Sequence, residues 1–119
     1  MTTTTLPSPV SAYVEATNSF NLDRFVAAFA DDALVNDHRD EFIGKEQIRA
    51  WAAHEIIGDH VTMKVVDVRL LGNHVALKAE VDGDFDKKGL PSPLVLAFYF
   101  SVSDGRISAL VIVHNKTAR

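Results

Sequence analysis

Hydrophobic residues in the first half of the chain recur at the spacing of amphipathic helices. Apolar side chains fall every three or four residues over 10–17 and again over 22–29, which predicts a helical hairpin. Ser8-Pro9 is typical of a helix start, because serine can cap free amides and proline suits the first helical position. Asn21 is the expected cap of the second helix. A third amphipathic helix is predicted over about 45–57.

In the second half of the chain the hydrophobic positions repeat every second residue, which is the spacing of β-strands. Residues 75–81 alternate strictly between apolar and polar side chains. Over 61–70 the apolar positions change parity, which predicts a β-bulge or a strong bend. Residues 83–93 have the composition of a loop, and two further strands are predicted at 94–102 and 106–115. Because helices precede a meander of antiparallel strands, the predicted fold class is α+β.

The last two strands are apolar on both faces, so the register of their hairpin decides which face lines a cavity. Pairing of Val102 with Ile107 would continue as Tyr99 with Leu110, Ala97 with Ile112, and Val95 with His114. These residues would then share one side of the sheet. The other face would be a large exposed patch on a monomer, formed by Leu96, Phe98, Phe100, Ala109, Val111 and Val113. A homodimer formed through this face of the sheet is therefore expected.

Composition limits the class of protein and its partners. The 119 residues suffice for a single domain, 1–119, in which residues 1–7 are expected to form a flexible tail. A net charge of −4 without a basic stripe argues against a nucleic-acid partner. No apolar run approaches the roughly 20 residues of a membrane helix, so no membrane partner is expected. The absence of cysteine excludes disulfides and thiolate sites. The first residues lack the features of a secretory signal, and a cytoplasmic location is expected.

Several short motifs carry a resemblance to a known superfamily. They are Tyr13-Val14-Glu15, Phe29-Ala30-Asp31-Asp32-Ala33, Val35-x-Asp37, Gly44-x-Glu46-Gln47-Ile48 and Gly105-Arg106-Ile107. With the order of elements, they make the chain similar to the nuclear transport factor 2-like (NTF2-like) superfamily, in its SnoaL-like and ketosteroid isomerase-like branches. The resemblance implies a cone-shaped fold with three N-terminal helices packed on a strongly bent antiparallel sheet. It also implies a hydrophobic cavity between the helices and the sheet.

The ketosteroid isomerase pattern implies roles for individual residues of this chain. The base that carries a proton between two carbons matches Asp37, and the tyrosine that holds the enolate oxygen matches Tyr13. The second oxyanion donor falls on Ala97, which has no donor group. Loss of one such donor typically costs about 10²–10³ in rate, so steroid isomerisation itself is not expected.

The resemblance and the expected register together imply a cavity wall. The expected substrate-binding residues are Trp51, Leu77, Ala79, Val95, Ala97, Tyr99 and Leu110, with His114 as a third catalytic candidate beside Asp37 and Tyr13. Each has a structural alternative: Asp37 could cap a turn, Tyr13 could be a core tyrosine, and His114 could bond to backbone. His38 follows Asp37 and is expected to point the opposite way, toward the surface. His54 and His60 flank acidic residues, but their spacing matches no zinc pattern, so no metal is expected.

These observations favour a SnoaL-like protein that binds a hydrophobic small molecule. As an enzyme it would be a cofactor-free isomerase, cyclase or dehydratase with Asp37 as general base. The alternative is a non-catalytic ligand-binding or assembly module of the same fold. An epoxide hydrolase like the limonene enzyme would need an arginine between two aspartates, and Arg69 and Arg106 are poorly placed for that. The loop 83–93, with Lys87, Lys88, Asp84 and Asp86, is expected to be solvated, and Gly83 and Gly89 to give it flexibility.

Overall fold

The computed structural model describes residues 6–114 and has ten elements of secondary structure. In chain order they are α1 (Ser8–Asn18), α2 (Leu22–Ala27), β1 (Phe29–Asp37), β2 (Asp40–Ile43), α3 (Gly44–Trp51), the π-helix η1 (Ala52–Ile57), β3 (Thr62–Leu71), β4 (His74–Asp82), β5 (Leu94–Ser103) and β6 (Arg106–His114). The expected α+β class is confirmed. Residues 1–5 of the expected tail lie outside the described residues, whereas Leu6 packs against the core.

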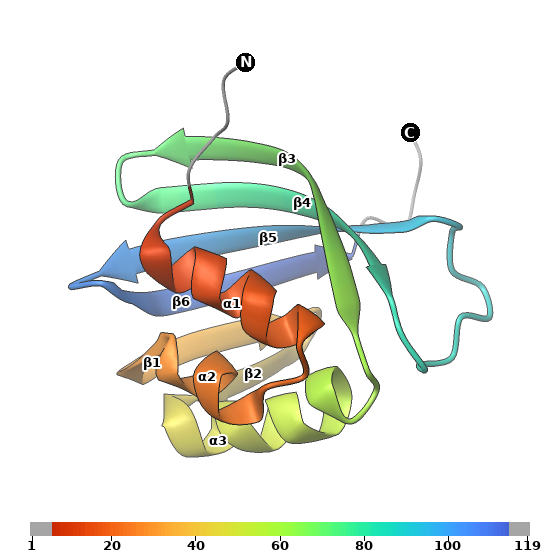
Figure 1. Cartoon of the computed structure of the whole chain (residues 1–119), viewed down its shortest axis with the longest axis horizontal. Coiled ribbons are helices and arrows are strands. Elements are labelled where there is room, and N and C mark those ends of the chain that lie inside the picture. The colour runs from red at the N-terminus through yellow and green to blue at the C-terminus, as the bar shows by residue number, and fades with distance from the viewer. Residues whose placement is uncertain (1–5, 115–119) are drawn as a thin grey trace.

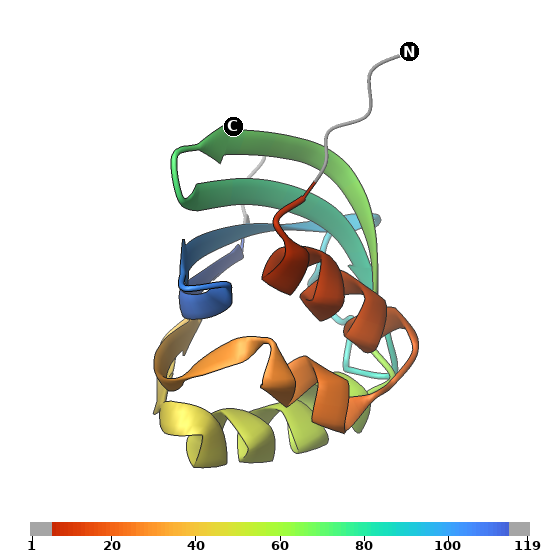
Figure 2. The same ribbon diagram turned by 60° about the vertical axis from the view of Figure 1, so that its left-hand side comes forward.

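The six strands form one sheet with the order β2-β1-β6-β5-β4-β3. Helix α1 crosses the inner face of this sheet, and α3 lies beneath β1 and β2 (Figure 1). Figure 2 shows β3 and β4 curving over α1, so that the sheet wraps around the helical side of the molecule. The expectation of an antiparallel sheet is wrong at one pairing, because β1 runs parallel to β6. β1 and β2 form an antiparallel hairpin between α2 and α3, and β1 joins this hairpin to the predicted meander.

The predicted helices form, although one predicted cap does not. Asn21 caps α2 by accepting a hydrogen bond from the Arg24 N–H at 3.1 Å. Helix α1 begins at Ser8, which is already helical, and Pro7 holds the capping position without a side-chain bond. The third helix reaches Ile57 as expected, but its last residues turn as a π-helix.

The predicted β-bulge of β3 is confirmed between Val65 and Asp67, where the register with β4 shifts. Val66 is the extra residue and is 48% exposed. After the bulge Val68 pairs with Leu77, so the apolar positions return to the inner face. The bulge therefore explains the parity change that the sequence shows.

The predicted register of β5 and β6 is wrong beyond its first pair. Val102 pairs with Ile107 as expected, but Ser101 then pairs with Ala109, which leaves Ser108 as an extra residue in β6. The Ser108 hydroxyl donates to the Ser101 carbonyl at 3.1 Å and accommodates the bulge locally. Beyond this bulge each residue of β5 pairs with the residue of β6 one position later than predicted. Because side chains alternate between the two faces of a sheet, the β5 side chains lie on the face opposite to the predicted one.

The shift reverses the predicted faces of β5, whereas Leu110, Ile112 and His114 of β6 lie on the inner face as predicted. Tyr99 pairs with Val111 and Ala97 with Val113 on the outer face. The inner face carries Leu96, Phe98, Phe100, Leu110, Ile112 and His114. The exposed apolar side chains of the outer face are Tyr99, Val111 and Val113.

Asn18 joins the end of α1 to β3 by two hydrogen bonds. Its amide donates to the Met63 carbonyl at 3.0 Å, and its side-chain oxygen accepts from the Met63 N–H at 2.8 Å. These two hydrogen bonds fix the end of α1 against β3, which is an edge strand of the sheet.

Asn18→Ala is expected to lower the free energy of unfolding by about 1–3 kcal/mol, because it leaves both backbone groups of Met63 without a protein partner. Denaturant unfolding measures the loss. Asn73→Ala is the matched control, because it removes a single exposed bond to Val102. Equal losses in the two variants would contradict the role assigned to Asn18.

Candidate active site

A pocket of about 260 Å³ opens between the helices and the inner face of the sheet. Its floor is apolar and includes Leu96, Phe98 and Ile112 from β5 and β6. Three polar side chains that the sequence analysis singled out also line it: Tyr13, Asp37 and His114. They come from α1, β1 and β6, so the pocket brings together groups from both ends of the chain.

Asp37 is the last residue of β1, and both of its carboxylate oxygens have partners. The Trp51 Nε1–H donates to Oδ2 at 3.1 Å, and His114 Nε2 lies 3.3 Å from Oδ1. Because a carboxylate can only accept, Nε2 is the ring nitrogen that carries the hydrogen in this contact. The Asp37 side chain remains 20% exposed and that of His114 28% exposed. The carboxylate is therefore held in one orientation while it remains open to a ligand.

Trp51 reaches Asp37 because it ends α3, directly beside the carboxyl end of β1. Its ring stacks on Phe42 of β2 at a centroid distance of 5.6 Å. Its ring also packs at an angle against that of Phe25, with the centroids 5.9 Å apart. Packing against two aromatic rings fixes the direction of the indole N–H, which orients the Asp37 carboxylate.

Tyr13 lies on the buried face of α1 and is only 1% exposed. Its hydroxyl has no hydrogen-bond partner among residues 6–114. Every fully buried side-chain polar atom in that part of the chain has a partner, so the Tyr13 hydroxyl is not fully buried. The hydroxyl therefore reaches the space of the pocket. Burial, and then the charge of Asp37, raise the pKa of Tyr13 well above its usual value. Tyr13 stays protonated at neutral pH and can donate a hydrogen bond to a ligand.

The SnoaL-like domain profile matches residues 10–110 of this sequence. The chain belongs to the SnoaL-like domain family. This confirms the resemblance to the SnoaL-like and ketosteroid isomerase-like branches of the NTF2-like superfamily. No curated protein sequence matches the chain.

Solved structures similar to this SnoaL-like domain include two with substantial sequence identity. A proposed polyketide cyclase from Sinorhizobium meliloti is 28% identical, with a TM-score of 0.80 over 90% of this chain and 94% of that one. A protein of ketosteroid isomerase-like fold from Catenulispora acidiphila, in complex with trimethylamine, is 25% identical, with a TM-score of 0.78 over 92% of this chain and 87% of that one. An NTF2-like protein from Cytophaga hutchinsonii, 15% identical with a TM-score of 0.75 over 97% and 95%, shares the fold.

The structure places the other expected lining residues of the SnoaL-like domain outside this pocket. Trp51, Leu77, Ala79 and Leu110 are buried in the core and do not line it. Ala97 and Tyr99 lie on the outer face with Val95, as the Ser108 bulge requires, and Tyr99 is 47% exposed. Ala97 therefore says nothing about hydrogen-bond donors in the pocket.

His38 is exposed, as expected, but for a different reason. It adopts a left-handed conformation, with φ of 63°, in the turn after β1, so the alternation of a strand does not apply to it. Its ring centroid lies 4.8 Å from that of His114. The His38 ring thus lies beside that of His114 rather than on the opposite side of the strand.

Sequence reasoning missed the acidic residues at the mouth of the pocket. Glu55 and Asp59 come from η1 and the turn after it, and Asp86 comes from the loop 83–93. Burial raises the pKa of Glu55, and the charges of Asp37 and Asp40 raise it further. Helical periodicity places Glu55 only approximately, because the π-helix rotates its side chain relative to an α-helix.

Glu55→Gln is expected to raise the melting temperature near pH 7 but not near pH 4. A carboxyl whose pKa is raised by folding favours the folded state while protonated, below its ordinary value of 4.5. That contribution is lost as pH rises through the raised value, so at neutral pH glutamine removes a repulsion with Asp37. The shift is small because Glu55 is largely exposed.

Thermal unfolding at the two pH values measures this shift. Glu46→Gln is the matched control, because Glu46 is exposed on the adjoining α3 and does not line the pocket. An equal rise in both variants, or at both pH values, would contradict the interaction of Glu55 with Asp37.

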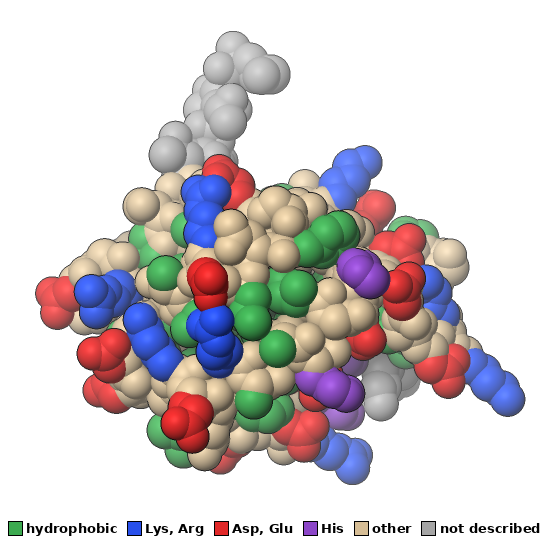
Figure 3. Space-filling model, turned by 60° about the horizontal axis from the view of Figure 1, so that its bottom comes forward, with side chains coloured by type: hydrophobic (Ala, Val, Ile, Leu, Met, Phe, Trp, Pro, Cys, Tyr) green, Lys and Arg blue, Asp and Glu red, His purple; other side chains and the backbone are tan. Residues whose placement is uncertain are grey.

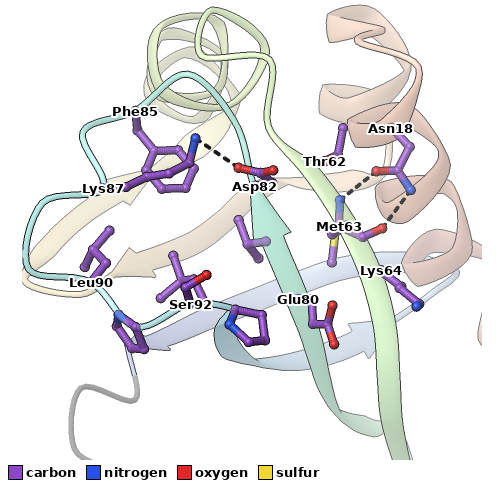
Figure 4. Close-up of a pocket in the computed structure, with 14 residues that line it drawn as sticks. Asn18, Thr62, Met63, Lys64, Glu80, Asp82, Phe85, Lys87, Leu90 and Ser92 are labelled. Atoms are coloured by element: carbon purple, nitrogen blue, oxygen red, sulfur yellow. Dashed lines mark hydrogen bonds and ion pairs between the residues drawn. The ribbon is translucent and has the colours of Figure 1, made fainter.

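A larger groove of about 760 Å³ adjoins the pocket on the side of the loop 83–93. Figure 4 shows its polar rim, where Lys87 pairs with Asp82 at 3.0 Å. Phe85 and Leu90 of the loop line both the groove and the pocket, so the loop forms the partition between them. At Gly83 a Cβ would approach the Asp59 carbonyl to 2.9 Å, so this glycine serves close packing.

Three features of the described part of the SnoaL-like domain bear on nucleic-acid, metal and membrane sites. The face in Figure 3 carries charges of both signs interspersed, without a basic stripe. Among residues 6–114 there is no cluster of His, Cys, Asp and Glu side chains suited to a metal ion. Nor is any helix there long and apolar enough to cross a membrane.

Proposed function

We propose that this SnoaL-like domain is an enzyme that transfers a proton on a hydrophobic small molecule without a cofactor. The observation that carries the proposal is the placement of Asp37. Its carboxylate faces a small apolar pocket, is oriented by Trp51 and His114, and shares that pocket with the free hydroxyl of Tyr13. A base and an oxyanion donor beside an apolar floor are the groups that enolisation requires.

In this mechanism Asp37 removes a proton from a carbon next to a carbonyl group. The C–H electron pair moves into the carbonyl, and Tyr13 donates a hydrogen bond to the oxygen that becomes negative. Protonated Asp37 then returns the proton to another carbon of the same substrate, so that an isomerase balances without a redox partner. His114 stabilises the Asp37 carboxylate between turnovers and is the alternative donor to the oxyanion.

The relatives support a reaction of this class. The Sinorhizobium meliloti protein is a proposed polyketide cyclase, and ring closure of a polyketide also begins with removal of a proton beside a carbonyl. The Catenulispora acidiphila protein binds trimethylamine, which supports a small-molecule ligand for this fold. For this chain, isomerisation, cyclisation and dehydration share the same first step at Asp37.

The second candidate is a ligand-binding or assembly module without catalysis. The specific observation in its favour is the strand that faces Tyr13, because β5 presents Leu96 and Phe98 to the pocket and neither can donate to an oxyanion. We also propose, with either candidate, a cytoplasmic homodimer through the outer sheet face, where Tyr99, Val111 and Val113 are exposed.

Deuterium uptake from D₂O tests the proposal without knowledge of the natural substrate. A panel of cyclic and acyclic ketones with acidic α-protons is incubated with the protein, and uptake is followed by NMR. Enzyme-dependent uptake at one carbon, in at least one ketone, is the expected result. Uptake no faster than in buffer across a panel that binds in the pocket favours the non-catalytic module.

A further inference from the structure

We propose that the pocket selects a ligand that carries a positive charge, namely an alkylammonium ion with a compact apolar skeleton. This proposal deepens the proposed function, since it concerns the same pocket, and it names the substrate class: a substrate of the proposed reaction would be a ketone that also carries an ammonium group. Selection of a cation depends on the carboxylates that surround the pocket and on the unpartnered hydroxyl of Tyr13. It does not depend on whether Asp37 acts as a base.

The charged residues that line the pocket are all acidic. Four carboxylates line it, Asp37, Glu55, Asp59 and Asp86, and no lysine or arginine does. The nearest lysine of the loop, Lys87, is engaged with Asp82 at 3.0 Å and lines only the neighbouring groove. His114 is the only basic side chain at the pocket, and it already contacts Asp37.

The carboxylates at the mouth form no ion pairs within the described chain, whereas comparable carboxylates do, and Asp86 accepts the backbone N–H of Lys88 at 2.9 Å. Asp82 pairs with Lys87, and Asp84 pairs with His60 at 2.8 Å. Glu55, Asp59 and Asp86 form no ion pair among residues 6–114. An acidic rim without internal cations attracts a cation from solution, and like charges so placed repel an anionic ligand.

Tyr13 is a second and independent sign of a polar ligand. Its side chain is 1% exposed and its hydroxyl, which reaches the pocket, has no partner in the described part of the chain. Because the hydroxyl is open to the pocket and unpaired within the described chain, a ligand group can bond to it without displacing a protein partner. The phenol oxygen can accept an ammonium N–H while Asp37 attracts the charge.

The floor of the pocket defines the other half of the ligand. Leu96, Ile112 and Val61 offer only apolar contacts, and Phe98 and Tyr13 add aromatic rings whose centroids lie 6.3 Å apart. Aromatic faces attract cations as well as apolar groups. The volume of about 260 Å³ suits a ligand with a compact body and one charged end.

Three compounds with one carbon skeleton test the proposal. They are 3,3-dimethylbutylamine, 3,3-dimethylbutanol and 3,3-dimethylbutanoate, which at neutral pH are a cation, a neutral molecule and an anion. The chain has one tryptophan, so its indole N–H gives one NMR signal, and this group donates to Asp37. Titration of that signal reports binding at the pocket and requires no turnover.

The amine is expected to bind about tenfold or more tightly than the alcohol, and the carboxylate more weakly than either. Glu55→Gln and Asp59→Asn are each expected to weaken amine binding severalfold and to leave alcohol binding unchanged. Glu46→Gln, which removes the same charge away from the pocket, is expected to change neither.

Equal affinities for the three compounds, or tightest binding of the carboxylate, would overturn the proposal. Failure of the amine to bind at millimolar concentration would do the same. An equal effect of Glu46→Gln and Glu55→Gln would assign the attraction to net charge and so also overturn it. Because deuterium uptake is measured separately, loss of cation selectivity and loss of proton transfer are distinguishable outcomes.

Discussion

Asp37→Asn is expected to slow deuterium uptake into a bound ketone by about 10²–10⁴-fold, which is the usual contribution of a positioned general base. Asparagine has the same shape and can still accept the hydrogen bond from Trp51, while its amide N–H donates to His114 Nε2 once the imidazole takes its other tautomer. The pocket therefore keeps its form, and the loss reports the missing base rather than a change of structure. The rate of uptake at saturating ketone is the quantity measured.

Two further variants distinguish the base from the groups around it. Asp32→Asn makes the same substitution in β1 at an exposed position outside the pocket and is expected to leave the rate unchanged. Trp51→Phe removes the N–H that orients the Asp37 carboxylate and is expected to reduce the rate by a smaller factor than Asp37→Asn. Full activity of Asp37→Asn would show that the base lies elsewhere or that exchange is not enzymatic.

Phe25→Ala is expected to lower the free energy of unfolding by about 3–5 kcal/mol, the range for truncation of a fully buried aromatic side chain. Phe25 is 0% exposed at the centre of an aromatic cluster. Its ring lies 4.7 Å from Tyr13, 5.6 Å from Phe29 and 5.9 Å from Trp51. The cavity left by alanine removes contacts from all three rings, and two of these residues position the site.

Chemical denaturation measures this loss, and two variants calibrate it. Phe25→Leu keeps an apolar side chain in the space and is expected to cost less than alanine. Leu71→Ala removes an apolar side chain that is 78% exposed and is expected to change stability by about 0.5 kcal/mol or less. A loss for Phe25→Ala no larger than that for Leu71→Ala would contradict the central role of Phe25 in the core.

Local signals were sufficient for much of the fold. Asn21 caps α2 where the sequence places it, and the parity change in 61–70 marks a real bulge after Val65. Both features depend on interactions between residues a few positions apart, so they can be predicted from the local sequence. The same holds for the family, because its motifs are short runs such as the one that ends at Asp37.

Which side chains of β5 line the pocket depends on a single residue, the extra Ser108 of β6. The local pattern of apolar and polar residues does not show where this bulge lies. β5 and β6 are apolar on both faces, so either register satisfies the alternation of hydrophobic positions. The bulge at Ser108 selects the register that points Phe98 into the pocket and Tyr99 to the outside. Packing of the inner face against α1 decides between the two, and that contact is long-range.

The sequence by itself determined the α+β class, the family and the candidacy of Asp37, Tyr13 and His114, because periodicity and short motifs carry this information. Only the tertiary structure decided that Asp37 and His114, 77 residues apart in the chain, lie 3.3 Å from each other. It also decided that Glu55 joins them from the π-helix at the mouth of the pocket. Such contacts arise from the closure of a curved sheet around helices, and no local spacing of residues encodes that distance.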